Sequence, residues 1–266
     1  MENRLNNIIL KTDSYKLTHK NQYPAGTTNI YSYFEARTGA KFNNTVFFGL
    51  QMLLKKHLLG QVVTKEKIEQ AEQFAIGHMG NKAAFNRAGW EYILNKHGGR
   101  LPVRIRAVEE GTVVPISNAL MTVENTDPEC FWLTNYLETL LVQAWYPTTI
   151  ATLSRENKKN ILKYLEETGD PAGIMFKLHD FGYRGVSSDE TAGLGGAAHL
   201  VNFMGTDTIM GILYGQEYYN TEEMLAFSIP ASEHSTITSW GGPDKESAAM
   251  RNMIDQYKDF PLVACV

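Results

Sequence analysis

The pattern of hydrophobic positions changes character near Tyr146. Before that point, short runs of β-branched and aromatic residues alternate with helical stretches in no regular order, which predicts an α+β layer. The expected helices are residues 50–59, ending at Gly60, and a helix that begins after Thr64 with Glu66 in its first turn. The expected strands are residues 29–34, 45–48, 103–108 and 120–123.

The strongest helix start lies just after residue 125. Thr126 and Glu129 have the spacing of a capping box, and Pro128 occupies a position where a missing N–H costs little. Over residues 131–141, apolar side chains cover too much of the circumference for a surface helix. We therefore expect this helix to be packed on several sides.

From Ser154 the pattern becomes a regular alternation of helices and short apolar strands. A helix runs to about residue 167, another opens at Ser187 with Glu190 at capping-box spacing, and two more cover residues 208–219 and 245–257. This order predicts a parallel sheet with helices outside it. The expected strands are residues 174–178, 200–203, 225–229 and 262–266.

These patterns predict an α/β fold class with two domains. Residues 1–150 are expected to form an α+β N-terminal domain, and residues 151–266 the first half of a (β/α) barrel. A complete barrel of this type needs about eight parallel strands, of which about half are present. Because the chain stops at Val266 inside an expected strand, we expect a partner chain or further sequence to complete the barrel.

Composition limits the kinds of partner. With 43% hydrophobic residues and a net charge of −4, the chain can form a sizeable core but has no broad basic field for nucleic acid. Cys130 and Cys265 lie far apart among apolar residues, which favours reduced core thiols and a cytoplasmic location. Neither secretion nor membrane insertion is expected, because residues 1–11 lack a cleavage site and no apolar stretch approaches ~20 residues.

The candidate chemistry follows the expected strands of the second half. Ligands of parallel α/β proteins bind beyond the carboxyl ends of the strands, where this chain has polar segments at 179–185, 205–207 and 230–236. Phenylalanine stacks on a planar ring, a carboxylate accepts from an amide, and arginine binds phosphate. The sequence therefore predicts an enzyme acting on a heterocyclic or phosphorylated small molecule. The candidate residues are Phe181, Arg184, Asp207 and His234.

Three of these residues also have a purely structural interpretation. Phe181 alone is typical of a core aromatic side chain. Asp207 has the position of an N-cap for the helix that follows it. Arg184 could form a structural ion pair with Asp180 or Asp189.

The remaining polar and glycine positions have similar alternatives. His234 is typical of a loop histidine, and His179 of a hydrogen-bonded residue at a strand end. Lys55 and Lys56 are typical of a solvated helix face. A glycine cluster suggests a nucleotide loop, but it falls inside an expected helix, which favours close helix packing. The cluster comprises Gly193, Gly195 and Gly196.

Long ordered motifs at these positions resemble nicotinamide phosphoribosyltransferase. The resemblance runs essentially from end to end and reaches well beyond the candidate residues. The motifs are TDSYKLTH at 12–19, YSYFEAR at 31–37, VENTDPEC at 123–130, KLHDFGYRGVSS at 177–188 and EHSTIT at 233–238.

The resemblance implies a type II phosphoribosyltransferase fold and a pentosyltransferase of NAD biosynthesis. Such enzymes transfer phosphoribosyl from 5-phosphoribosyl 1-pyrophosphate to nicotinamide, which gives nicotinamide mononucleotide and pyrophosphate. They use Mg²⁺ and accessory ATP hydrolysis, and they are homodimers with shared active sites. These properties are expectations for this chain.

The resemblance also implies roles around the pyridine ring. Phe181 would stack on one face of the ring, and Tyr15 of the neighbouring protomer would cover the other. Asp207 would accept a hydrogen bond from the carboxamide. Ser228 and Ile229 would line the tunnel beside the ring.

Three further residues have implied roles in phosphate chemistry. Arg184, together with Arg37 of the neighbouring protomer, would bind pyrophosphate or phosphate oxygens. His234 would be phosphorylated by ATP. None of the residues present is expected to bind metal, because the family's Mg²⁺ ligands lie mainly in a C-terminal half that this sequence lacks.

The chain departs from the family pattern in two ways. The family continues with segments that bind ribose, the 5′-phosphate and magnesium, so we expect the isolated chain to have little turnover. Ala264 stands where some relatives have serine near the pocket. Two alternatives stay open: nicotinate phosphoribosyltransferase, and a non-catalytic module that complements a separate C-terminal half.

Overall fold

The N-terminal part is built on an antiparallel sheet. The computed structural model describes residues 4–265. Its central strand β5 (Ala119–Asn125) pairs with β1 (Tyr31–Glu35) on one side and β3 (Val103–Ala107) on the other. A second pair joins β2 (Asn44–Val46) to β4 (Val113–Pro115). Four of these strands match predicted ones, whereas β4 has only three residues and was not predicted.

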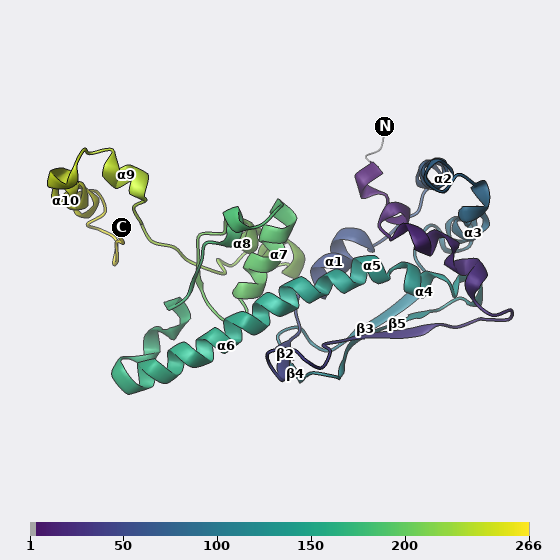
Figure 1. The fold of residues 1–266 in the computed structure, drawn as a ribbon, viewed down its shortest axis with the longest axis horizontal. Coiled ribbons are helices and arrows are strands. Elements are labelled where there is room, and N and C mark those ends of the chain that lie inside the picture. Colours follow the sequence, from purple (N-terminus) through teal and green to yellow (C-terminus); the bar gives the residue numbers. More distant parts are fainter. Residues whose placement is uncertain (1–3, 266) are drawn as a thin grey trace.

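Helices and short 3₁₀ turns cover this sheet (Figure 1). Helix α2 begins as predicted, because the Thr64 hydroxyl accepts a hydrogen bond from the Lys67 backbone N–H at 3.3 Å. The helices are α1 (Leu50–His57), α2 (Lys65–Met79), α3 (Arg87–His97), α4 (Leu133–Tyr136) and α5 (Glu138–Leu141). The 3₁₀ turns are η1 (Arg4–Asn6), η2 (Ile8–Leu10), η3 (Ser14–Gln22), η4 (Lys82–Ala84), η5 (Pro128–Cys130) and η6 (Val142–Ala144).

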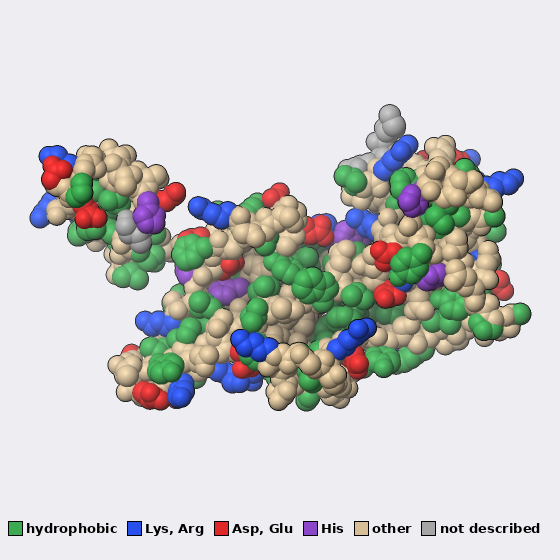
Figure 2. All heavy atoms as spheres, viewed as in Figure 1, with side chains coloured by type: hydrophobic (Ala, Val, Ile, Leu, Met, Phe, Trp, Pro, Cys, Tyr) green, Lys and Arg blue, Asp and Glu red, His purple; other side chains and the backbone are tan. Residues whose placement is uncertain are grey.

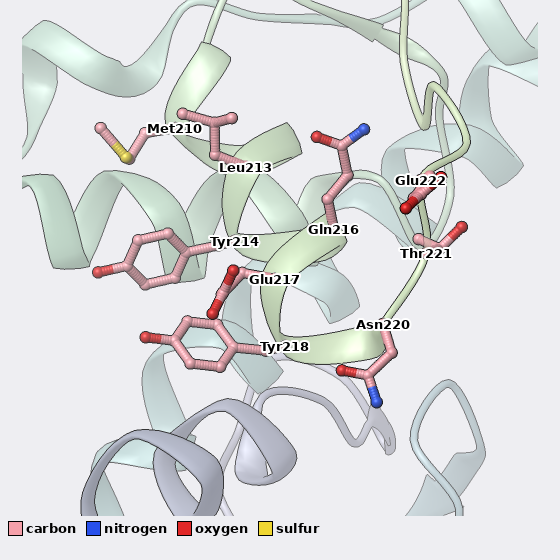
Figure 3. Close-up of a pocket in the computed structure, with 9 residues that line it drawn as sticks. All are labelled: Met210, Leu213, Tyr214, Gln216, Glu217, Tyr218, Asn220, Thr221 and Glu222. Atoms are coloured by element: carbon pink, nitrogen blue, oxygen red, sulfur yellow. The ribbon is translucent and has the colours of Figure 1, made fainter.

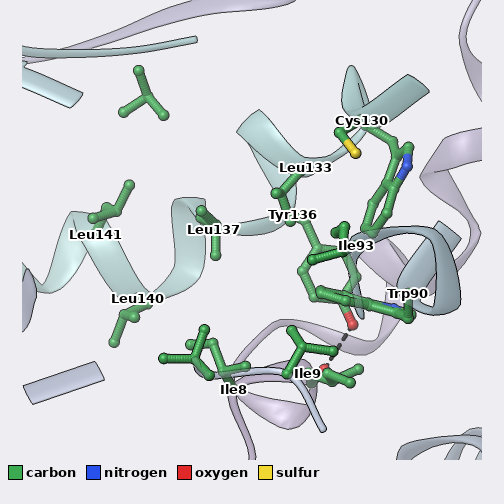
Figure 4. Packing of buried hydrophobic residues seen from close by; sticks show 14 of the residues in the cluster. Ile8, Ile9, Trp90, Ile93, Cys130, Leu133, Tyr136, Leu137, Leu140 and Leu141 are labelled. Atoms are coloured by element: carbon green, nitrogen blue, oxygen red, sulfur yellow. Dashed lines mark hydrogen bonds between the residues drawn. The ribbon is translucent and has the colours of Figure 1, made fainter. Parts of the chain in front are cut away.

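The main core of this part is aromatic at one end and aliphatic at the other (Figure 4). The rings of Trp90 and Trp132 meet edge to face at 4.9 Å, and the buried Tyr136 hydroxyl donates to the Ile9 carbonyl at 2.7 Å. The apolar segment after residue 130 supplies much of this core, so its predicted burial on several sides is confirmed.

The predicted start and continuity of that segment are wrong. Asp127, not Thr126, is the N-cap, because its carboxylate accepts from the Glu129 N–H at 2.9 Å. The Thr126 N–H instead donates to the Pro102 carbonyl, which ties that residue to the sheet. The segment then forms short helical pieces before the long helix α6 (Trp145–Thr168).

Helix α6 connects the two halves of the chain. Near its start, the Thr148 and Thr152 hydroxyls accept from the Phe48 and Val46 N–H groups of the β2 region, at 3.2 and 2.9 Å. The helix runs without interruption through residue 150, where we predicted a domain boundary. The division into two domains stays a prediction.

A short parallel ladder follows α6, in agreement with the predicted fold class. Strand β6 (His179–Asp180) pairs in parallel with β7 (Gly205–Thr206), and Gly205 forms a parallel bridge with Phe227. Helix α7 (Asp189–His199) and helix α8 (Ile209–Tyr219) alternate with these strands. The Ser188 hydroxyl caps α7 one residue later than predicted, by accepting from the Thr191 N–H.

Two of the four predicted strands of this part are displaced in sequence, whereas the bridging residues Phe227 and Ala264 lie within the predicted strands 225–229 and 262–266. Residues 174–178 largely belong to the 3₁₀ turn η7 (Pro171–Phe176), which the Asp170 carboxylate caps by accepting from the Ala172 N–H. Residues 200–203 form the turn that ends α7. The residues that pair in β6 and β7 come after these two apolar runs. The apolar side chains therefore precede the parallel ladder and do not form it.

The glycine cluster permits α7 and α8 to cross closely, as predicted. A Cβ atom on Gly196 would lie 2.8 Å from the Gly211 Cα, and one on Gly193 would lie 2.4 Å from the Tyr214 ring. The cluster is therefore a packing feature and not a nucleotide loop.

The last helices lie apart from the rest of the protein. Figures 1 and 2 show α9 (His234–Thr238) and α10 (Glu246–Gln256) at the end of an extended segment. The chain then returns, and Ala231 forms a parallel bridge with Ala264. The other 3₁₀ turns are η8 (Gly182–Gly185) and η9 (Pro243–Lys245).

Two sequence predictions about cysteine and lysine side chains need correction. Cys130 is buried as predicted, but Cys265 is exposed, because it lies outside any helix or strand, next to the isolated bridge at Ala264. Lys55 and Lys56 are not simply solvated, since both contact α8 through their ammonium groups.

Within residues 4–265, no helix is both long enough and apolar enough to span a bilayer.

Candidate functional site

Side chains from three consecutive segments meet at the carboxyl ends of the parallel ladder. His179 and Phe181 come from β6 and the residue after it, Asp207 follows β7, and Ser228 follows the bridge at Phe227. The His179 Nε2 atom lies 3.2 Å from Asp207 Oδ1, to which the Ser228 hydroxyl also donates. The His179 and Phe181 ring centroids are 4.8 Å apart.

Backbone hydrogen bonds fix these segments relative to one another. The Asp207 N–H donates to the Asp180 carbonyl at 2.9 Å, and the Thr206 N–H donates to the Phe227 carbonyl at 3.1 Å. The Asp180 carboxylate accepts from the Gly182 N–H at 2.8 Å, which turns the chain after Phe181. The side chains therefore project from a hydrogen-bonded frame.

The structure separates the functional and structural interpretations of Asp207. The N-cap position of α8 belongs to Thr208, so Asp207 does not cap this helix. Its side chain is 38% exposed, and within residues 4–265 the Ser228 hydroxyl and His179 Nε2 both contact Oδ1. The Oδ2 atom is therefore able to accept from a ligand.

The Phe181 and Arg184 side chains are also exposed to solvent rather than packed in the core. Phe181 is 65% exposed, which excludes a core role, and it offers a ring face to a planar ligand. Arg184 is exposed in η8 and forms no ion pair with any of residues 4–265. The carboxylates that could have paired with it accept elsewhere, Asp180 from Gly182 and Asp189 from the Tyr183 hydroxyl.

The other candidate residues lie outside this cluster. His234 is exposed in the first turn of α9, the lobe that Figure 1 shows apart from α7 and α8. Tyr15 is exposed in η3, where its ring contacts His19. Arg37 lies just after β1, and Ile229 is half-buried next to Ser228. Within residues 4–265, the chain brings together Phe181, Asp207 and Ser228, but it does not bring His234 against them.

Sequence reasoning missed a buried histidine that supports the site. His199 Nε2 lies 3.2 Å from the Gly205 carbonyl, and its Nδ1 lies 3.1 Å from the Ser154 hydroxyl. Burial lowers the pKa of His199, so the ring is kept neutral between these two partners. The histidine thereby links α6 and α7 to the strand that precedes Asp207. In the sequence, His199 could have been noticed because it lies at the end of a helix rich in glycine and alanine.

Two voluminous hollows do not coincide with this chemistry. One of about 850 Å³ lies along α8 and the turn after it, where Figure 3 shows Tyr214 and Tyr218 side by side. Another of about 660 Å³ lies between β1, β5 and the start of α6, and Arg37 is among its lining residues. We place the site at the strand ends because the ring, the carboxylate and the hydroxyl converge there.

A cluster that could suggest a metal is satisfied without one. Ligand atoms of His97, Asp127 and Cys130 lie within 4.8 Å of one another. The Asp127 carboxylate already accepts from His97 Nε2 at 2.8 Å and from the Tyr92 hydroxyl at 3.1 Å. Burial raises the pKa of the Cys130 thiol to about 12, so it remains protonated. The cluster is a hydrogen-bonded helix cap.

The strand-end carboxylates are each engaged with the protein through one oxygen. Mg²⁺ is usually bound by one or two free carboxylates together with phosphate oxygens and waters. Asp180 and Asp207 each accept hydrogen bonds from the protein on Oδ1. We assign neither carboxylate to a metal, and the chemistry below uses no magnesium step.

Family models match both halves of the chain. The model described as "Nicotinamide phosphoribosyltransferase, N-terminal domain" matches residues 7–105. The model described as "Nicotinate phosphoribosyltransferase (NAPRTase) family" matches residues 176–264. The second match contains all the side chains of the strand-end cluster.

Curated relatives and a solved structure agree with these matches. A nicotinamide phosphoribosyltransferase of Xanthomonas campestris pv. campestris is 50% identical over 255 residues, which is 95% of this chain and 53% of that protein. One of Acinetobacter baylyi is 33% identical over 98% of this chain and 54% of its own length. The chain thus spans about half the length of the curated relatives it matches.

The structural comparison concerns the fold alone. The crystal structure of human nicotinic acid phosphoribosyltransferase superposes with a TM-score of 0.59 at 19% identity, over 86% of this chain and 40% of that chain. The predicted combination of an N-terminal domain and a partial phosphoribosyltransferase barrel is confirmed. Over nearly its whole length the chain is thus similar to one half of curated nicotinamide phosphoribosyltransferases, and its residues 7–105 match the model of their N-terminal domain.

Proposed function

We propose that the protein containing this chain transfers phosphoribosyl from 5-phosphoribosyl 1-pyrophosphate to nicotinamide in NAD biosynthesis. The observation that supports this most directly is the exposed Phe181 ring beside an Asp207 carboxylate with an available Oδ2 atom. Together these groups complement nicotinamide, which has a flat ring and an amide donor. The curated relatives carry the same activity in their names.

In this proposal the protein acts by positioning and by electrostatics. Nicotinamide stacks on Phe181 and donates its carboxamide N–H to Asp207 Oδ2, which directs the pyridine nitrogen toward the ribose. The nitrogen lone pair forms the new bond to C1′ while the bond from C1′ to pyrophosphate oxygen breaks. Pyrophosphate leaves with that electron pair, and Arg184 stabilises its charge. Ser228 and Ile229 line the path beside the ring.

A second copy of the chain completes the site in this proposal. Tyr15 is 57% exposed, and Arg37 is exposed beside the 660 Å³ hollow, so both are free to reach a neighbouring protomer. Tyr15 would cover the open face of the pyridine ring. Arg37 would add a second guanidinium at the phosphates.

His234 is proposed to take the γ-phosphoryl group of ATP, which releases ADP. Its exposure in the first turn of α9 leaves the imidazole open to a nucleotide. A phosphohistidine would add negative charge to the lobe formed by α9 and α10. Magnesium would accompany the phosphates of the substrates, with ligands other than the carboxylates described here.

The test is a comparison of nicotinamide and nicotinate as substrates. The purified protein that contains this chain, rather than the isolated chain, should form mononucleotide from nicotinamide, measured by mass spectrometry. Asp207→Asn should lower the preference for nicotinamide over nicotinate by roughly tenfold or more, because it removes a charged acceptor for the amide and a charge that repels the acid. Asp244→Asn, in the exposed turn η9, is the matched control.

The same assay tests the alternatives. The family model over residues 176–264 favours nicotinate as a second candidate substrate. A preference for nicotinate in the unaltered protein would establish it and would remove the proposed role of Asp207. Nicotinamide binding without turnover of either base would instead favour a non-catalytic module.

A further inference from the structure

We propose that His179 is a positioning residue that sets the choice between an amide and an acid on the bound ring. This inference rests on the proposed function, since it concerns how the same site recognises its base. His179 is the only described side chain in recorded contact with both proposed base-binding groups, the Phe181 ring and the Asp207 carboxylate.

The first contact fixes the carboxylate. His179 Nε2 lies 3.2 Å from Asp207 Oδ1, and the Ser228 hydroxyl donates to the same oxygen. These two contacts on one oxygen restrain the orientation of the carboxylate. They also leave Oδ2 as the acceptor for a ligand among the groups described in residues 4–265.

The second contact fixes the aromatic platform. The His179 imidazole lies against Phe181 with a 37° tilt between the rings, which limits rotation of a side chain that is otherwise largely exposed. The ring plane and the acceptor atom are thus aligned by one imidazole. An amide bound to this pair finds its acceptor in place, whereas a carboxylate meets a fixed negative charge.

A glycine makes this position of the imidazole possible. A Cβ atom on Gly205 would lie 2.8 Å from His179 Nδ1, so the strand residue paired with His179 has no room for a side chain. Gly205 does not have a left-handed φ, and alanine is therefore compatible with its backbone. Alanine at this position should displace the imidazole without removing a polar group.

Two substitutions of His179 separate its contacts. His179→Phe keeps a ring against Phe181 but removes the donor, and it should lower the ratio of kcat/KM for nicotinamide to that for nicotinate by roughly tenfold. His179→Gln keeps an N–H donor but removes the ring, and it should retain that ratio within about threefold while raising KM for both bases. A ratio in His179→Phe within about twofold of the unaltered protein would overturn the inference.

The matched control is another histidine that stacks on phenylalanine. His78 lies 5.7 Å from Phe74 in α2 and has no recorded carboxylate contact within the described chain. His78→Phe should leave the ratio unchanged. A loss of selectivity in this control equal to that of His179→Phe would show a general effect on folding and would count against a specific role for His179.

Two further variants keep the inference testable if His179→Phe does not fold. Gly205→Ala and Ser228→Ala should each reduce the amide preference, with thermal unfolding used to confirm a folded protein. If both single variants keep the full preference, the inference fails. If the unaltered protein acts on neither base, the proposed function itself fails.

Discussion

Glu190 shows how strongly one side chain depends on partners that are distant in sequence. It lies in the first turn of α7, where His57 Nε2 is 3.4 Å and Lys56 Nζ 2.8 Å from its carboxylate oxygens. The hydrogen bond from His57, followed by the interactions with Lys56, lowers the pKa of Glu190 to about 2. The sequence indicated a helix start at this residue, but it gave no sign of the ion pairs.

This depressed pKa makes stability depend on acid. Because the folded pKa lies below the unfolded value, the stabilisation is present above about pH 4.5 and is lost as the pH falls through about 2. Glu190→Gln should flatten that part of the curve and cost on the order of 1–2 kcal/mol at pH 7, since solvent partly screens the pair. Urea unfolding from pH 2 to 7 measures this, with the exposed Glu167→Gln as control. If the unfolding free energies of Glu190→Gln and the unaltered protein depend on pH in the same way, this prediction is wrong.

The candidate site was only partly predictable from single residues. Phe181 and Asp207 could be identified because they follow apolar runs that enter a parallel sheet, whereas Ser228, inside the predicted strand 225–229, was indicated only by the family resemblance. The contact between His179 and Asp207 could not, because 28 residues separate them and both could contact nearer groups. Whether Asp207 caps α8 was equally undecided until the backbone of Thr208 was known.

Among the helices and strands, the helices were located better than the strands. Capping residues such as Thr64 mark helix starts through local hydrogen bonds, which sequence reveals. The apolar runs at 174–178 and 200–203 carry no comparable signal, because a few apolar residues fit a 3₁₀ turn as well as a strand. Pairing with a neighbour decides between them, and that neighbour is remote in sequence.

The crossing of α7 and α8 gives a prediction about packing. Gly196→Ala should lower the free energy of unfolding by about 1–3 kcal/mol, because its Cβ would press on the Gly211 backbone. Gly77→Ala is the matched control, since it lies in α2 with open space around its Cα, and it should stabilise by about 0.5–1 kcal/mol. Chemical denaturation measures both. Equal shifts of the same sign would show that the crossing is looser than described.

The two halves of the protein are joined by more than the chain. The Lys55 ammonium and the Gln51 side-chain amide both donate to the Tyr218 carbonyl, at the C-terminus of α8. Tyr219 stacks on Phe48 at 5.6 Å and donates to Glu110. These partners are more than a hundred residues apart, so periodicity and motifs could not have revealed them. The domain boundary at residue 150 stays a prediction made from the sequence.

One substitution tests this connection. Tyr219→Phe retains the ring stack but removes the donor to the partly buried Glu110, and it should cost about 1.5–3 kcal/mol of unfolding free energy. Tyr164→Phe, on the exposed side of α6, should have no measurable effect. Thermal unfolding compares the two. An unchanged midpoint for Tyr219→Phe would mean that this hydrogen bond does not join the halves.

The bridge between Ala231 and Ala264 has a consequence for how this region could be shortened. The two residues pair in parallel, so the chain that connects them must run back to the end from which Ala231 was entered before it reaches Ala264. A tight hairpin connects only antiparallel segments and cannot make this connection. Any deletion within α9 or α10 therefore has to leave enough chain for this connection, or Ala264 will no longer pair with Ala231.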